Sequence, residues 1–257
     1  MPNSVSGSSP CRRLPPNKRV LVLSHRKIKH QVLDLLKNQD LAEILKKFQS
    51  FPAKDGVNAL FSAICRDEPR LKWFAVTCMG VAVARLAAQD MEEARIVMRR
   101  LLWSLNDESG GIGWGAPESM AEIMCQNRPL AEEYAHMLVS YMREDGEELC
   151  QDGNFIEHPL LQRGVLWGVA RMSGCHPDLM NKMGVAGDLE QYLRSPDLEI
   201  RGLAVLAAGI LPCEQTRALL EQVAPDTQPF TLYRDGSFHQ VTMVELLQSA
   251  RCEKVEA

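Results

Sequence analysis

The sequence lacks long hydrophobic runs and has little excess of either charge. No apolar run approaches the ~20 residues that cross a bilayer, and the first residues carry no apolar segment of a secretory signal, so we expect a cytoplasmic protein without a membrane partner. Lysine and arginine number 29 against 33 aspartates and glutamates, a net charge of −4. Because binding through phosphates needs a basic excess, nucleic acid is not expected as a partner.

Paired cysteine motifs are also missing. None of the eight cysteines forms a CxxC pair, and we expect reduced thiols. A metal site could use Cys150, His158, Cys175 and His176, but their spacing matches no familiar ligand pattern, so no metal is predicted. The sequence has no recognisable Ser-His-Asp, Cys-His or Gly-x-Ser-x-Gly arrangement, and we expect neither a cofactor nor an enzyme. The alternative is a catalytic pair in which His158 acts with the thiol of Cys150 or Cys175.

Helical patterning fills most of the chain. Residues 1–19 are rich in Ser, Pro and Asn and are expected to form a disordered tail. From about residue 24 the apolar residues recur every three or four positions, which predicts helices of about 10–18 residues. Several prolines stand where helices are expected to begin, because a first-turn proline lacks only an N–H that would be unpaired there; they are Pro69, Pro117, Pro129, Pro159 and Pro196. Ser195 is the expected cap of the last of these helices.

Two predicted helices repeat one another at an offset of 38 residues. Arg163-Gly164 and Arg201-Gly202 each begin a run of small and aliphatic residues in the same helical phase. A period near 40 made of helix pairs predicts an α-solenoid.

The segment SPDLEIRGLAVLAAGIL (195–211) resembles a HEAT-like repeat of the phycobilisome-lyase type. HPLLQRGVLWGVARM (158–172) is similar, with Gln162 where the family has an aliphatic residue. The resemblance is clear over 158–225 and weaker over 53–145. Through NDESGGIGWGAPE (106–118) and 158–172 the chain is also similar to a group of uncharacterised bacterial HEAT-like proteins. The resemblance implies a superhelix of helix pairs in which Arg163 and Arg201 contact neighbouring repeats, and it implies no lyase chemistry.

The C-terminal segment departs from the helical pattern. Residues 230–241 alternate around Asp235-Gly236, which predicts a β-hairpin with a type I′ turn. Thr242 and Glu245 form a capping box for a last helix. We therefore expect an all-α solenoid over residues 20–228. The hairpin and helix of residues 229–257 are expected to cap its terminal apolar face.

The loop at 106–118 is the least repeat-like segment and the first candidate site. Its four glycines let a ligand approach the backbone closely, and Trp114 stands between two of them. Asp107, Glu108 and Glu118 make it acidic, so a cationic or hydrogen-bonding visitor is expected. The alternative is a plain helix connection in which Trp114 fills a gap between repeats.

Four further residues complete the candidate binding set: Asn106 at the start of the loop, and Glu157, His158 and Trp167 at the 158–172 repeat. His158 precedes Pro159 as Ser195 precedes Pro196, and histidine is a mediocre helix cap, which suggests another use. The alternatives are a packed or capping histidine and a tryptophan that fills the core.

Three functions fit this sequence. The first is a protein- or peptide-binding scaffold that anchors its partner on Trp114 and selects a basic segment through Asp107, Glu108, Glu118 and Glu157. The second is a HEAT-like enzyme acting on nucleic acid, similar to DNA glycosylases for alkylated bases, with Trp114, Trp167 and Asp107 as candidate residues. The third is a purely structural subunit, which predicts no cluster of polar and aromatic side chains on the concave face.

Overall fold

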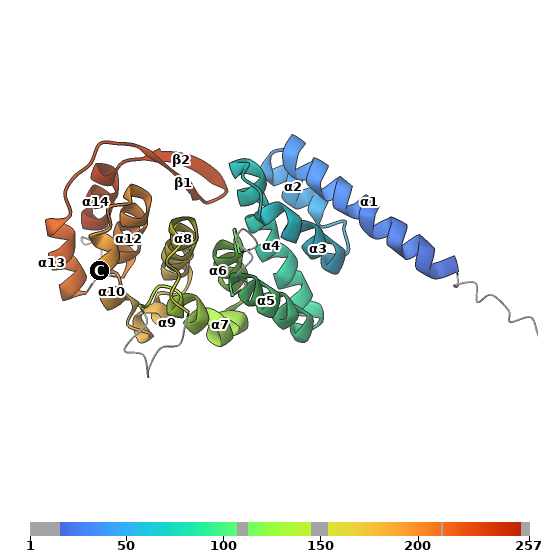
Figure 1. Ribbon diagram of the computed structural model, residues 1–257, viewed down its shortest axis with the longest axis horizontal. Coiled ribbons are helices and arrows are strands. Elements are labelled where there is room, and N and C mark those ends of the chain that lie inside the picture. Colours follow the sequence, from blue (N-terminus) through green and yellow to red (C-terminus); the bar gives the residue numbers. More distant parts are fainter. Residues whose placement is uncertain (1–15, 107–112, 145–153, 212, 253–257) are drawn as a thin grey trace, which may run out of the picture.

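The computed structural model describes residues 16–106, 113–144, 154–211 and 213–252 (Figure 1). Helices dominate these residues: α1 (Pro16–Asn38), α2 (Leu41–Phe48), α3 (Ala53–Ile64), α4 (Pro69–Gln89), α5 (Met91–Leu105), α6 (Ala116–Gln126), α7 (Arg128–Ser140), α8 (Pro159–Cys175), α9 (Pro177–Lys182), α10 (Val185–Asp188), α11 (Glu190–Leu193), α12 (Leu198–Ile210), α13 (Glu214–Gln222) and α14 (Met243–Cys252). Helix α1 begins at Pro16, so residues 16–19, expected in the tail, are helical.

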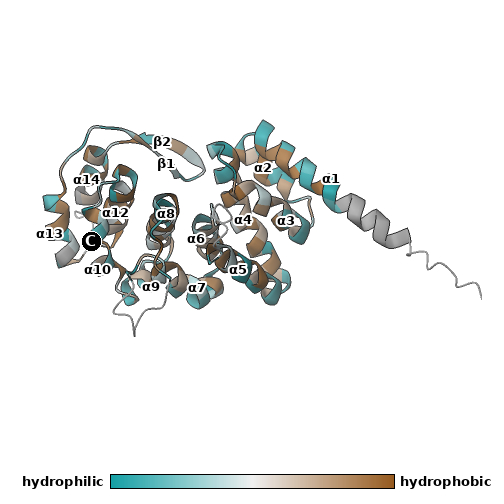
Figure 2. Cartoon of the chain, in the orientation of Figure 1, coloured by the Kyte–Doolittle hydropathy of each residue, from teal (hydrophilic) through white to brown (hydrophobic). Residues whose placement is uncertain are grey.

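The helices form a solenoid, as the repeat predicts. Helices α4, α6, α8 and α12 pack side by side in sequence order, with α3 beside α4 and α14 beside α12 (Figure 1). Helices α5, α7, α9 and α13 cover the other side of this row. Hydrophobic residues are frequent along the helices of this row (Figure 2), and many of them are buried. Each helix pair thus buries its apolar stripe against the next pair.

Helix α4 is long and apolar enough to cross a membrane, and among the described residues it is the single helix of that kind. In the fold it packs between α3 and α6, and 56% of its most apolar window is buried. Its hydropathy therefore reflects a central helix of the row.

Helix starts follow the expected chemistry, with one exception. Four of the prolines lie in the first or second position of their helices: Pro69, Pro117, Pro129 and Pro159. Pro196 instead precedes the cap of α12. Asp197 is that cap and accepts from the backbone N–H groups of Glu199 and Ile200, so the prediction of Ser195 as the cap was wrong. The hydroxyl of Ser195 accepts from the Asp197 N–H, one step outside the helix.

The C-terminal hairpin pairs β1 (Phe230–Arg234) with β2 (Ser237–Val241). Asp235 and Gly236 have φ of 51° and 80°, which confirms the turn with two positive φ angles. The capping box before α14 is also present: the Glu245 N–H donates to the Thr242 hydroxyl, and the Thr242 N–H donates to the Glu245 carboxylate.

The hairpin does not cap the end of the solenoid. Helix α14 packs on α12 at that end, whereas the hairpin crosses the row (Figure 1). Phe230 lies over Gly202 of α12, and Tyr233 stacks on Trp73 of α4. Three strand residues span about 10 Å, but α12 and α4 would stand about 24–30 Å apart in a flat row. The row must therefore curve toward the hairpin, which lies on its concave face.

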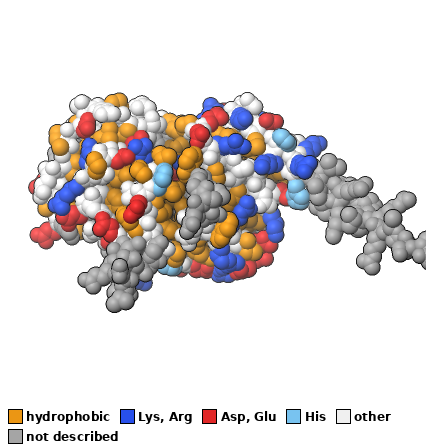
Figure 3. Space-filling model, in the orientation of Figure 1, with side chains coloured by type: hydrophobic (Ala, Val, Ile, Leu, Met, Phe, Trp, Pro, Cys, Tyr) orange, Lys and Arg blue, Asp and Glu red, His pale blue; other side chains and the backbone are white. Residues whose placement is uncertain are grey.

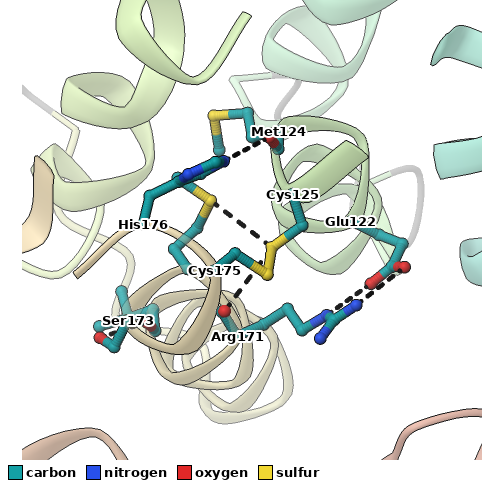
Figure 4. Close-up of a disulfide and its surroundings, with 9 residues drawn as sticks. Glu122, Met124, Cys125, Arg171, Ser173, Cys175 and His176 are labelled. Carbon is teal, nitrogen blue, oxygen red and sulfur yellow. Dashed lines mark hydrogen bonds and ion pairs between the residues drawn. A yellow bond between two sulfur atoms is a disulfide. The ribbon is translucent and has the colours of Figure 1, made fainter. Parts of the chain in front are cut away.

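A disulfide joins the C-terminal ends of α6 and α8, so the prediction of reduced thiols was wrong for Cys125 and Cys175 (Figure 4). Their Cα atoms are 5.5 Å apart, which suits a disulfide. The cysteines stand 50 residues apart, and only the packing of two neighbouring repeats brings them together. Cys78 is buried in α4 and is not bridged.

Candidate functional site

A cavity of about 290 Å³ lies on the concave face, between strand β1 and the N-terminal halves of α4, α6, α8 and α12. We call it the tryptophan pocket. Its walls combine indole rings with charged groups, among them Lys72, Trp73, Trp114, Glu118, Arg163 and Trp167. Four parallel helices contribute to one pocket because the row is curved.

An aromatic cluster closes the pocket against the hairpin. The ring centroids of Trp73 and Trp167 are 4.7 Å apart, and the ring of Tyr233 stacks on Trp73 at 4.8 Å. Trp167 Nε1 donates to the Tyr233 carbonyl oxygen at 2.7 Å, and the Tyr233 hydroxyl bonds to Thr77 at 2.7 Å. These contacts fix β1 to α4 and α8 at once and leave aromatic surface toward the pocket.

Glu118 is the buried charge of the pocket. Its side chain enters from the first turn of α6, is 2% exposed overall, and places Oε1 at 2.6 Å from the Lys72 ammonium. Its second oxygen, Oε2, has no hydrogen-bond partner among the described residues. A Cβ on Gly164 would lie 2.8 Å from this oxygen, so the glycine of the first Arg-Gly pair makes room for the carboxylate. A buried carboxylate oxygen without a donor is costly, and Glu118 is one of the residues that line the cavity.

Two basic residues of the pocket, Lys72 and Arg163, have aromatic or acidic partners. The Lys72 ammonium also lies 5.2 Å from the centroid of the Trp73 ring. Arg163 of α8 donates to Asp197 at 2.7 Å, which is the repeat-to-repeat contact implied for this arginine, and it also pairs with Glu199 at 3.1 Å. Burial raises the pKa of Glu199, although Arg163 opposes the shift. The pocket thus contains both acidic and basic side chains, and one oxygen of the Glu118 carboxylate has no hydrogen-bond donor among the described residues.

The arginine at the corresponding position of the second repeat makes different contacts. Arg201 donates to the carbonyl oxygen of Ser195 at 2.6 Å, within its own repeat, and lies 3.7 Å from Asp226. A Cβ on Gly202 would lie 2.4 Å from the Phe230 ring, so this glycine admits the hairpin as Gly164 admits Glu118.

A second cavity, of about 460 Å³, lies on the other side of β1, between Thr77 of α4, the later turns of α6, α8 and α12, helix α2 and the hairpin turn. Glu122, one helical turn after Glu118, faces it and pairs with Arg171 at 2.8 Å (Figure 4). Trp167, Leu232 and Tyr233 line both cavities, so strand β1 divides the concave face in two.

The structure brings together three of the residues singled out by sequence: Trp114, Glu118 and Trp167 all line the tryptophan pocket. Glu157 and His158 are exposed ahead of α8 and do not line it. His158 is the N-cap residue of that helix and makes no side-chain capping bond.

The other three predicted positions, Asn106, Asp107 and Glu108, stand at the start of the 106–118 segment. Asn106 ends α5 and accepts from the hydroxyl of Tyr141, apart from the pocket. Asp107 and Glu108 lie outside the described residues. Among the residues that the structure does describe, no group of three or more potential ligands is arranged to hold a metal.

Sequence reasoning missed Lys72, Trp73 and Tyr233. Lys72 and Trp73 lie in α4, outside the two Arg-Gly helices that the sequence pairs, and Tyr233 lies in the segment expected to be an end cap. The bond between Thr77 and Tyr233 joins residues 156 positions apart, and no local pattern indicates such a contact.

Surface charge is distributed unevenly on the face seen in Figure 3, where lysines and arginines gather over α1 and α2. Apolar side chains are more prominent toward the middle of this view. In the tryptophan pocket, by contrast, Lys72 pairs with Glu118, and Arg163 pairs with Glu199.

No protein-family model matches the chain, and no curated protein matches its sequence. A designed armadillo repeat protein in complex with peptide (KR)4 has a similar structure, with a TM-score of 0.51 and 17% identity over 92% of this chain and 93% of that one. A second designed armadillo repeat protein gives a TM-score of 0.49 at 17% identity, covering 92% and 94%. The row of helix pairs and the likeness to the first of these proteins place the fold in the class of helical-repeat solenoids.

Proposed function

We propose that the protein is a binding module that takes a basic segment of a partner protein on its concave face, with a lysine or arginine side chain in the tryptophan pocket. The observation that carries this proposal is Glu118 Oε2, a buried carboxylate oxygen without a hydrogen-bond donor among the described residues, in a residue that lines the same pocket as three tryptophans. A cationic side chain would supply the donor and would also be attracted to the indole faces. We further propose that the repeats are HEAT-like, of the type that 158–172 and 195–211 resemble.

The loop at 106–118 contributes to this proposal through its described end. Trp114 and Glu118 flank the start of α6, where Gly115 has φ of 76° and its Cβ position would lie 2.5 Å from the Ile64 carbonyl oxygen. Only glycine fits that approach. The turn thereby sets both side chains against the pocket.

The architecture supports a binding role as well. Solenoids bind partners along the concave surface formed by one helix of each pair. The structurally similar designed protein carries a (KR)4 peptide, a basic ligand. A purely structural subunit predicts no cluster of polar and aromatic groups on this face, and the tryptophan pocket is such a cluster.

The test uses a fluorescein-labelled (Lys-Arg)4 peptide as the probe, titrated with the full chain and followed by anisotropy, with a (Glu-Asp)4 peptide as its acidic counterpart. We expect saturable binding of the basic peptide alone. Trp114→Ala and Glu118→Gln should each weaken it at least about tenfold, in the range of a buried interface anchor. Trp103→Ala and Glu214→Gln are the matched controls, since both residues are exposed outside the pocket.

Lys72→Met should change the peptide affinity in the opposite direction. The variant removes the ammonium that now pairs with Glu118, so it should lose stability and bind the basic peptide more tightly, because the peptide then provides the missing cation. Circular dichroism and the Tm establish that each variant is folded. No binding by the wild type, or equal binding by wild type and Glu118→Gln, would overturn the proposal.

A further inference from the structure

Strand β1 has an outer edge whose backbone groups face away from β2. In a two-residue hairpin the residues that flank the turn form a hydrogen-bonded pair, and the pairs then alternate along the ladder. The pair Arg234–Ser237 flanks the turn, so Thr231 and Gln240 form a pair that is not hydrogen-bonded. The backbone N–H and C=O of Thr231 therefore point outward from β1, and those of Gln240 point outward from β2.

The outer edge of β1 faces the tryptophan pocket. Tyr233 belongs to the same outward-facing set as Thr231, and its carbonyl oxygen accepts from Trp167, a residue of the pocket wall. Thr231 lies two residues earlier on this edge and also lines the pocket. No hydrogen bond in the described part of the chain uses its backbone N–H or C=O, whereas its hydroxyl accepts from Gln240. On this edge the Tyr233 carbonyl oxygen thus bonds to the Trp167 indole, whereas the backbone groups of Thr231 have no hydrogen bond within the described residues.

We infer that the partner segment binds in extended conformation and pairs its backbone with Thr231, as a short third strand on β1. This inference rests on the proposed function and adds the conformation of the partner. Strand addition to a sheet edge supplies backbone hydrogen bonds, while pockets select alternate side chains. Here Thr231 supplies the backbone pair and Glu118 selects the side chain.

The size of the site favours an extended segment over a helix. A volume of about 290 Å³ lies at the low end for ligand pockets, and a helix with its side chains is about 10–12 Å across. The usable edge is also short. Pro229 has no N–H to offer on one side of Thr231, and Trp167 occupies the Tyr233 carbonyl on the other. One partner residue therefore forms the backbone pair, and its neighbours project toward the pocket walls.

The test compares Thr231→Pro with Gln240→Pro, using the same labelled (Lys-Arg)4 peptide and the full chain. Each variant removes one outward N–H and the Thr231–Gln240 side-chain bond, and neither removes a ladder hydrogen bond, so they are matched. We expect Thr231→Pro to weaken binding about fivefold, the effect of one hydrogen bond, and Gln240→Pro to leave it within about twofold. Equal affinities for Thr231→Pro and wild type, or the larger loss in Gln240→Pro, would refute the inference.

A second measurement does not depend on how the variants fold. In a scan of the (Lys-Arg)4 peptide by single N-methylation, binding should be lost at one or two positions whose N–H pairs with the Thr231 carbonyl oxygen. Uniform tolerance of N-methylation would refute the backbone pair while the proposed function stands. A wild-type protein that binds no basic peptide refutes the proposed function and this inference together.

Discussion

The seat of the hairpin on α12 can be tested with two glycines. Gly202→Ala adds a Cβ that would lie 2.4 Å from the Phe230 ring, closer than any relaxed contact, and 3.3 Å from Leu246. Gly174→Ala adds the same atom to α8 with nothing within 4 Å. The two substitutions make the same chemical change in two helices of the row, and they differ in what the new methyl group meets.

The expected free energies have opposite signs. Replacing a helical glycine by alanine stabilises a helix by about 0.5–1 kcal/mol, and this is the whole effect expected for Gly174→Ala. Overpacking costs about 1–3 kcal/mol, so Gly202→Ala should be less stable than Gly174→Ala by about that amount. Because Phe230 must move, the hairpin should loosen from α12 while the helices remain folded.

Urea denaturation followed by circular dichroism gives the unfolding free energies of the two variants and the wild type. Amide hydrogen exchange at Leu232, whose N–H belongs to the hairpin ladder, should accelerate in Gly202→Ala and stay unchanged in Gly174→Ala. If both variants gain the same stability, Phe230 does not rest on Gly202, and the reasoning that places the hairpin on the concave face fails.

Three further outcomes are expected. Burial raises the pKa of Tyr233 from 10.0 to about 12, so the folded state holds this proton more tightly than the unfolded state does. The free energy of unfolding should therefore fall between about pH 10 and 12. Urea titrations should show a smaller fall in the Tyr233→Phe variant. Peptide mapping without reductant should recover Cys125 linked to Cys175, and reduction should lower the unfolding free energy by about 2–4 kcal/mol. Burial raises the pKa of Glu199, and a cation bound in the pocket would lower it again. Binding of the (Lys-Arg)4 peptide should therefore release protons and weaken as pH falls from 7 to 4. The Glu199→Gln variant should show a flatter pH dependence.

Local chemistry made most of the fold predictable. The 38-residue offset between the two Arg-Gly helices predicts repeats, and α8 and α12 are indeed neighbours. Asp235-Gly236 predicts the turn because both residues need positive φ. The cap of α12 was displaced by two residues because Asp197 satisfies two backbone N–H groups where Ser195 could satisfy neither.

The site was predictable only in part. Trp114 and Glu118 stand out within one loop and meet in one pocket, but their partners come from other repeats. Lys72 reaches Glu118 because α4 and α6 are adjacent, and Tyr233 reaches Trp73 because the row is curved. The disulfide has the same origin, since the repeat spacing aligns the ends of α6 and α8. Contacts between repeats depend on superhelical geometry, which no sequence window contains.

The hairpin that crosses the concave face changes how the chain should unfold. In an open solenoid each repeat contacts only its neighbours, so the ends fray independently and stability is a sum of local terms. Here the Thr77–Tyr233 bond ties the first repeats to the last across 156 residues. The first and last repeats therefore lose their independence, and the molecule should unfold as one cooperative unit. Its folding should also be slower than that of an open array, because this closing contact is remote in sequence.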